Sequence, residues 1–135
     1  MRLVVADASA LGEYLLDPSG AATSELIESE EVDLHAPALC DIEILALVRR
    51  ALRQRETTLD VIRASELLED YSALPLTRHE HLELLPRIFS LRDNFSAYDA
   101  SYAALAEALG AELLTADHRF ACAARDHLAL VVHCP

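Results

Sequence analysis

The chain alternates short apolar runs with longer amphipathic stretches, a pattern typical of buried strands and of the helices that cover them. The apolar runs predict strands at residues 3–6, 32–36, 74–77, 112–115 and 130–132. Helical periodicity predicts helices at residues 8–16, 21–31, 37–55, 57–71, 82–92, 96–109 and 118–125. This alternation predicts an α/β fold with a mainly parallel sheet of four to five short strands flanked by helices.

Proline and glycine refine these boundaries. Pro37 is expected in the first turn of the helix that it opens, and Gly110 is expected to end the helix before it. Pro75 favours an edge position for the strand at residues 74–77, because proline has no N–H to donate to a neighbouring strand.

Size and composition predict one soluble domain over residues 1–135. Apolar residues make up 53% of the chain, yet no run approaches the roughly 20 needed to cross a membrane. Asp7 comes too soon after the first residue for a signal peptide. The three cysteines lie far apart, which favours reduced thiols. We therefore expect a cytoplasmic protein with no membrane partner.

The charge is strongly negative, with 23 acidic and 11 basic side chains and a net charge of −12. Every basic residue is arginine, so chemistry that needs a lysine, such as a P-loop or a Schiff base, is excluded. Three isolated glycines also exclude a dinucleotide-binding loop. An acidic chain binds nucleic acid poorly by itself. A role on nucleic acid would therefore need another source of positive charge.

Four acidic residues fall where the predicted strands and helices meet. Asp7 directly follows the first strand, and Asp117 lies just beyond the strand at residues 112–115. Glu43 and Asp99 lie early in predicted helices, and helices that follow parallel strands begin at the carboxyl edge of the sheet. Ligands bind at that edge in open α/β sheets, so we expect these four carboxylates to converge.

Each of these acids also has a purely structural interpretation. Asp7 and Asp117 stand where a side chain caps the following helix, and Asp99 completes a capping box. Glu43 lies too far along its helix to cap it, while Asp41 lies closer to the centre of the apolar stripe. Periodicity alone leaves open which of Glu43 and Asp41 belongs to a site.

Convergence would create strong repulsion, about 4 kcal/mol for two charges about 4 Å apart at an effective dielectric constant near 20. Protonation or a bound cation would relieve it. Oxygen donors without histidine or cysteine favour Mg²⁺ or Mn²⁺. A zinc site is conceivable but is not supported by any paired cysteine spacing. Its candidate ligands would be His118, Cys122, His133 and Cys134.

At these acidic positions the sequence resembles the PIN-domain ribonucleases, most of all the VapC toxins of bacterial type II toxin–antitoxin pairs. The likeness rests on VVADAS at residues 4–9, APAL at 36–39, DIEI at 41–44, LRDNFSAYDASYAALAE at 91–107 and LLTAD at 113–117. The segment at 91–107 is the most specific. The resemblance spans the chain from Leu3 nearly to its end and implies a PIN-like three-layer sandwich.

The resemblance also implies a function. The quartet that performs catalysis and binds the metal would be Asp7, Glu43, Asp99 and Asp117. Glu43 is thereby selected over Asp41, and Ser9 and Thr115 fall where small hydroxyl residues support the site. The family cuts single-stranded or loop RNA, often tRNA or rRNA, with Mg²⁺ or Mn²⁺. Its partner is a small antitoxin whose helix and arginines block the site.

Other residues offer further contacts. Tyr98 and Tyr102 are candidates for base stacking or for core packing. The alanine-rich helix at residues 97–108 and the early leucine-rich helices are candidates for a homodimer interface. A basic cluster along the helix of Glu43 is either a solvated face or a phosphate-binding surface. It comprises Arg49, Arg50, Arg53 and Arg55.

Three alternatives remain beside an endoribonuclease. A catalytically silent PIN-like binding module would use the acids only as helix caps. A DNA-directed nuclease on the same fold would need additional segments to hold branched DNA, which the short chain lacks. A haloacid-dehalogenase-like phosphatase would need a second aspartate where Ser9 stands, and a later lysine.

Overall fold

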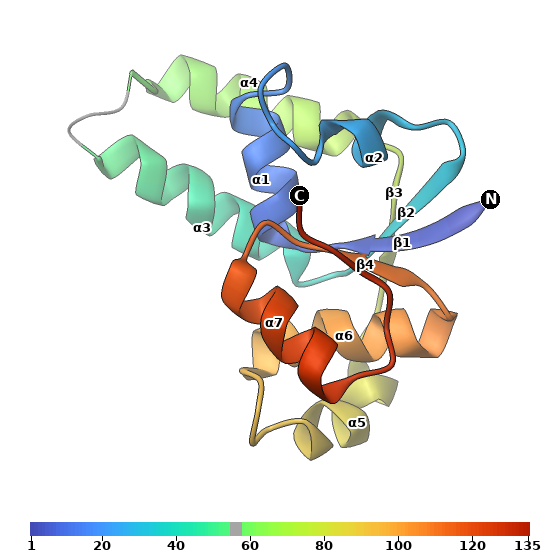
Figure 1. Ribbon diagram of the computed structural model, residues 1–135. Coiled ribbons are helices and arrows are strands. Elements are labelled where there is room, and N and C mark those ends of the chain that lie inside the picture. Colours follow the sequence, from blue (N-terminus) through green and yellow to red (C-terminus); the bar gives the residue numbers. More distant parts are fainter. Residues whose placement is uncertain (55–57) are drawn as a thin grey trace.

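The structure, a computed structural model, describes residues 1–54 and 58–135. The strands are β1 (Arg2–Ala6), β2 (Val32–Pro37), β3 (Leu76–His79), β4 (Glu112–Leu114) and β5 (Val132–His133). The helices are α1 (Ala8–Leu16), α2 (Ser24–Glu28), α3 (Cys40–Arg53), α4 (Val61–Ala73), the 3₁₀ turn η1 (Leu82–Leu84), α5 (Leu85–Ser90), α6 (Ala97–Leu109) and α7 (His118–His127). Figure 1 shows the sheet between two helical layers, α1–α4 on one side and α5–α7 on the other, which confirms the predicted three-layer α/β sandwich.

The sheet has five parallel strands in the order β3-β2-β1-β4-β5. The first three strands extend the sheet in one direction from β1, and the chain then returns to add β4 and β5 on the other side of β1. In open α/β sheets this change of direction leaves a crevice at the carboxyl ends of the two central strands. Asp7 follows β1 and Asp117 follows β4 by three residues, so both acids flank that crevice.

The core lies on both faces of the sheet, against α6 on one face and against α1, α3 and α4 on the other. Val4, Val5 and Ala6 in β1 are fully buried, as expected for a strand covered on both faces. Seven consecutive residues of α6, 100–106, are also buried. The proposal that this helix supplies a homodimer interface is therefore wrong for most of its length, because its own chain covers it. Gly110 ends α6 with φ 64°, as predicted, in the left-handed region that glycine adopts most easily.

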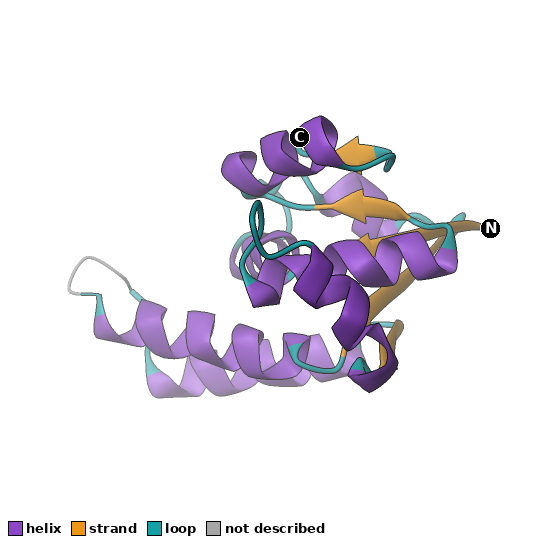
Figure 2. Cartoon of the chain, turned by 90° about the horizontal axis from the view of Figure 1, so that it is seen from below, coloured by secondary structure: helices purple, strands orange, loops and turns teal. Residues whose placement is uncertain are grey.

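Helices α3 and α4 lie side by side and project from the rest of the molecule (Figure 2). Arg55 and Thr57, which the sequence places at the end of one helix and the start of the next, lie outside the described residues. Asp60 caps α4, accepting a hydrogen bond from the N–H of Arg63 at 2.8 Å. Within the described ranges, no helix is both long and apolar enough to span a membrane.

Some predicted boundaries differ from the structure. The helix expected at residues 21–31 is reduced to α2. It starts after Thr23, whose buried hydroxyl donates to the carbonyl of Ala10, and it ends where the backbone becomes extended at Ser29. Pro37 ends β2 rather than opening a helix, since it pairs with His79 of β3. The helix expected at residues 82–92 is divided into η1 and α5. The strand β3 begins just after Pro75 and is an edge strand, as predicted.

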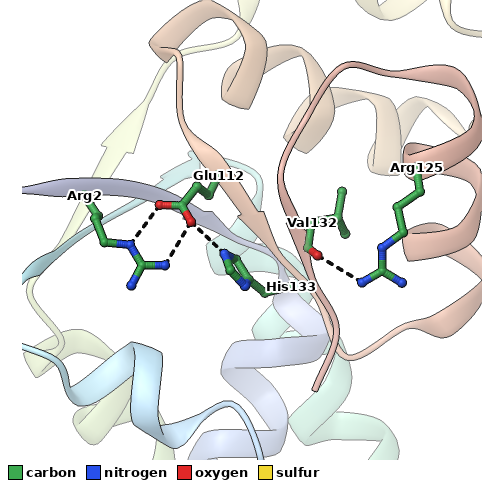
Figure 3. Close-up of polar contacts among 5 residues, drawn as sticks. All are labelled: Arg2, Glu112, Arg125, Val132 and His133. Atoms are coloured by element: carbon green, nitrogen blue, oxygen red, sulfur yellow. Dashed lines mark hydrogen bonds and ion pairs between the residues drawn. The ribbon is translucent and has the colours of Figure 1, made fainter.

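The carboxylate of Glu112 links strands β1, β4 and β5 through its side-chain contacts (Figure 3). Glu112 of β4 accepts two hydrogen bonds from Arg2 of β1, at 2.9 and 3.0 Å, and lies 2.7 Å from Nε2 of His133 in β5. These contacts lower the pKa of Glu112 to about 2, chiefly through Arg2 and then His133. The side chain of Arg125 donates to the carbonyl of Val132, which anchors β5 against α7.

Candidate active site

A pocket of about 220 Å³ opens at the carboxyl ends of β1 and β4. The first turns of α1 and α6 and the inner side of α3 form its walls. All four predicted acids line it. The lining residues are Asp7, Ala8, Ser9, Glu43, Ala46, Leu47, Arg50, Asp99, Tyr102 and Asp117.

Asp7 is the most firmly held of the four. One carboxylate oxygen accepts from the hydroxyl of Ser9 at 2.6 Å and from the N–H of Ala10 at 2.9 Å. The other accepts from the hydroxyl of Thr115 at 2.5 Å. Asp7 is only 5% exposed, and this burial raises its pKa despite the hydrogen bonds, with a further contribution from Asp117. Ser9 and Thr115 thus support Asp7 directly, as the sequence resemblance implied.

Asp117 caps α7 and also faces the pocket. Its Oδ1 accepts from the backbone N–H groups of Arg119 at 2.9 Å and Phe120 at 3.2 Å. Its own N–H donates to the hydroxyl of Thr115 at 3.0 Å. The capping interpretation and the site interpretation are therefore compatible for Asp117, and the same holds for Asp7, which caps α1.

Asp99 has no such structural role. Ser96 caps α6 through the N–H of Asp99, and the Asp99 carboxylate forms no hydrogen bond within residues 1–54 and 58–135. Partial burial, followed by the charges of Asp117, Asp7 and Glu43, raises the pKa of Asp99 to about 6. Asp99 lies among three other carboxylates without a partner of opposite charge, so its ionised side chain does not stabilise the metal-free fold.

Glu43 reaches the pocket from α3. Its Oε1 accepts a hydrogen bond of 2.6 Å from the hydroxyl of Tyr102, which lies on α6. Burial and the charge of Asp7 raise the pKa of Glu43, while the hydrogen bond from Tyr102 opposes that shift. We did not predict this contact: the sequence placed Tyr102 only among core or stacking candidates. The sequence signal that could have placed Tyr102 at the site is its spacing of three residues from Asp99, because residues three apart lie on the same face of a helix.

Asp41 points elsewhere. Its Oδ1 accepts from the hydroxyl of Tyr71 at 2.6 Å and from Nε of Arg78 at 2.7 Å. Burial opposes the change, but these two partners lower the pKa of Asp41 overall. The choice that helical periodicity left open is thus decided by residues far away in the sequence, and Glu43 is the acid that lines the pocket.

The predicted basic cluster lies partly at the pocket. Arg49, Arg50 and Arg53 are exposed on α3, and Arg50 lines the pocket itself, whereas Arg55 lies outside the described residues. Arg50 forms no ion pair within the part of the chain that the structure describes. An unpaired guanidinium beside carboxylates suits a ligand that carries phosphate.

The donor chemistry fits a hard divalent cation, because every acidic group at the pocket offers carboxylate oxygen. Burial raises the pKa values of Asp7, Glu43 and Asp99, and the neighbouring carboxylates add to each shift. Within the described ranges, however, no three His, Cys, Asp or Glu side chains are already arranged around a cation position.

The conceivable zinc ligands do not assemble. Cys134 Sγ lies 3.4 Å from Nδ1 of His118, but His133 contacts Glu112 instead.

Tyr98, the other stacking candidate, is 64% exposed at the start of α6.

Known proteins share both sequence and fold with this chain. Residues 4–126 match the PIN domain family. The chain is 45% identical over 118 residues to VapC ribonuclease Mb0985 of Mycobacterium bovis, covering 87% of each protein, and 38% identical to ribonuclease VapC3 of Mycobacterium tuberculosis, covering 87% of this chain and 85% of that one. The crystal structure of PAE2754 from Pyrobaculum aerophilum superposes with a TM-score of 0.70 at 24% identity, covering 97% of this chain and 83% of that chain. The chain therefore belongs to the PIN domain family.

Proposed function

We propose that this chain is a metal-dependent endoribonuclease and the toxin of a VapBC-type toxin–antitoxin module. The observation that carries the proposal is the meeting of four carboxylates at one pocket, two from the loops after β1 and β4 and two from α3 and α6. The relatives named as VapC ribonucleases support RNA as the substrate. We further propose that residues 1–135 act as a single PIN domain.

In this proposal Asp7, Glu43, Asp99 and Asp117 hold Mg²⁺ or Mn²⁺. The bound cation would activate a water for attack on phosphorus and stabilise the developing charge. Asp7 would supply a carboxylate of fixed orientation, because Ser9 and Thr115 hold its two oxygens. Asp99 would supply a carboxylate that no hydrogen bond holds within the described residues. No side chain needs to act as the nucleophile.

Substrate binding falls to the arginines of α3. Arg50 lies beside the carboxylates and is proposed to contact a phosphate next to the cleaved bond, with Arg49 and Arg53 extending that path. These side chains, together with the bound cation, compensate locally for the net charge of −12. That the RNA substrate is a tRNA or an rRNA stays a prediction.

The alternatives receive less support. A silent binding module needs the acids only as caps, yet Asp99 and Glu43 cap no helix. A phosphatase would need an aspartate at position 9, where the Ser9 hydroxyl instead donates to Asp7. A DNA-directed nuclease on this fold is not favoured by relatives named as ribonucleases.

Two kinds of protein partner are proposed, each at its own surface. We propose a cognate antitoxin with basic side chains that reach the acidic pocket. We also propose a homodimer. The early leucine-rich helices stay candidates for its interface, and the apolar groove of about 360 Å³ beside α5, where Phe89 is 66% exposed, is a further candidate. The cytoplasmic location stays a prediction.

Cleavage of RNA by the purified chain tests the function. We expect cleavage with Mn²⁺ and none with EDTA. Asp99→Asn should lower the rate at least about 100-fold, because it removes a cation ligand from the reaction centre. Asp93→Asn is the matched control, since Asp93 is exposed on the preceding loop and lines no part of the pocket. Equal rates for the Asp99 variant and the parent would contradict the proposed site.

A further inference from the structure

Two buried tyrosines hold neighbouring acids of α3 on different sides of the helix. Tyr102 of α6 is 2% exposed and its hydroxyl donates to Glu43 at 2.6 Å. Tyr71 of α4 is 4% exposed and its hydroxyl donates to Asp41, also at 2.6 Å. Two residues along an α-helix are separated by about 200° of rotation. The two hydroxyls therefore restrain α3 from opposite directions.

Cys40 lies where the two restraints meet. It is the first residue of α3 and is fully buried. Its thiol interacts with the hydroxyls of both Tyr71 and Tyr102, and its pKa is raised, chiefly by burial. The start of α3 is thus packed against both tyrosines, and each tyrosine holds its own acid.

Glu43 needs such a restraint more than the other acids. It reaches the pocket on a side chain with several rotatable bonds, whose ordering costs up to about 2 kcal/mol. The charge of Asp7 acts against its ionised form. A glutamate that is repelled by its neighbour and not tethered would turn toward solvent, where its charge is better solvated.

We propose that Tyr102 is a positioning residue, which holds Glu43 in the pocket through its hydroxyl so that the carboxylate is ready to bind a divalent cation. This inference rests on the proposed function, because it assigns Tyr102 to the same site. Oε1 of Glu43 accepts from Tyr102, and Oε2 forms no hydrogen bond within residues 1–54 and 58–135. One oxygen is therefore held while the other is available as a ligand. Partners that orient metal ligands in this way affect metal affinity strongly.

The test is Tyr102→Phe, which removes the hydroxyl and keeps the ring in the core. Mn²⁺ binding is measured by calorimetric titration of the metal-free protein, and RNA cleavage is measured over a range of Mn²⁺ concentrations. We expect about 10-fold weaker Mn²⁺ binding. We also expect cleavage to recover at high Mn²⁺ concentration, because the reacting groups themselves are intact.

Tyr71→Phe is the matched control. It removes a buried hydroxyl of the same kind from a residue that restrains the same helix through Asp41, which does not line the pocket. We expect a similar loss of thermal stability and unchanged Mn²⁺ binding. Unchanged binding in Tyr102→Phe, or equally weakened binding in both variants, would overturn the positioning role.

Glu43→Gln separates this inference from the proposed function. Weaker Mn²⁺ binding in Glu43→Gln but not in Tyr102→Phe would overturn the role of Tyr102 and leave the cation site standing. If Glu43→Gln binds Mn²⁺ as tightly as the parent does, Glu43 does not contribute to the cation site. That result would overturn both the role of Tyr102 and the assignment of Glu43 as a ligand.

Discussion

At the scale of single residues, the four acids differ in what they contribute to the fold. Asp7 and Asp117 each complete a hydrogen-bonded cap, whereas the carboxylate of Asp99 forms no hydrogen bond within the described residues. The sequence predicted their convergence because strand ends and helix starts share one edge of the sheet. It could not decide between Asp41 and Glu43, since the deciding partners, Tyr71 and Tyr102, come from other helices.

The raised pKa of Asp99 predicts a pH-dependent stability. The ordinary value is 3.8 and the folded value is about 6. Between these values the unfolded chain loses the proton while the folded chain keeps it, so the free energy of unfolding falls as pH rises. Above pH 6 both states are ionised and the loss is complete. Removal of the ionisable group by Asp99→Asn should therefore raise stability at neutral pH.

Urea unfolding in EDTA at a series of pH values measures this effect. We expect the stability advantage of Asp99→Asn over the parent to grow from pH 4 to about 6 and then stay constant. Comparison of the two proteins cancels other titrations, such as that of His79, whose pKa is lowered by burial and by His35. An advantage that does not change with pH would mean that Asp99 is not held among like charges.

At the scale of elements, patterns local to the chain predicted most of the structure. The bounds of α1 were predicted in full, and those of β1 and α6 to within a residue. Prediction failed where a distant segment decides the outcome. Pro37 belongs to β2 because β3 pairs with it, and α2 starts later than expected, after Thr23, whose hydroxyl donates to the carbonyl of Ala10. Neither pairing leaves a periodic signal.

The contacts of Glu112 allow a test at this scale, because they join β1, β4 and β5. Glu112→Gln should lower the free energy of unfolding at neutral pH by about 1 kcal/mol, the upper range for exposed ion pairs. Since the pKa of Glu112 falls from 4.5 to about 2, this contribution is present above pH 4.5 and is lost as pH falls toward 2. High salt should reduce the difference between Glu112→Gln and the parent. A difference that is insensitive to both pH and salt would show that the charge is not its source.

At the scale of the whole molecule, the pocket exists because the sheet changes direction between β1 and β4. The sequence predicted a parallel sheet but not this strand order, since the order depends on pairings between segments more than 100 residues apart, as in Ala6 and Leu114. The topology brings like charges together in a chain whose net charge is already −12. The metal-free fold is therefore less stable than its packing would allow, and a cation should restore the loss.

Melting temperatures of the parent and of Asp99→Asn, with EDTA and with saturating Mn²⁺, test this claim most directly. In EDTA the variant should melt at the higher temperature, because it lacks an unpaired charge. With Mn²⁺ about 100-fold above its dissociation constant the parent should gain about 2.7 kcal/mol and become the more stable protein, while the variant responds little. The order of the two melting temperatures should thus reverse. A variant that is less stable in EDTA, or a parent that does not respond to Mn²⁺, would contradict a shared cation site.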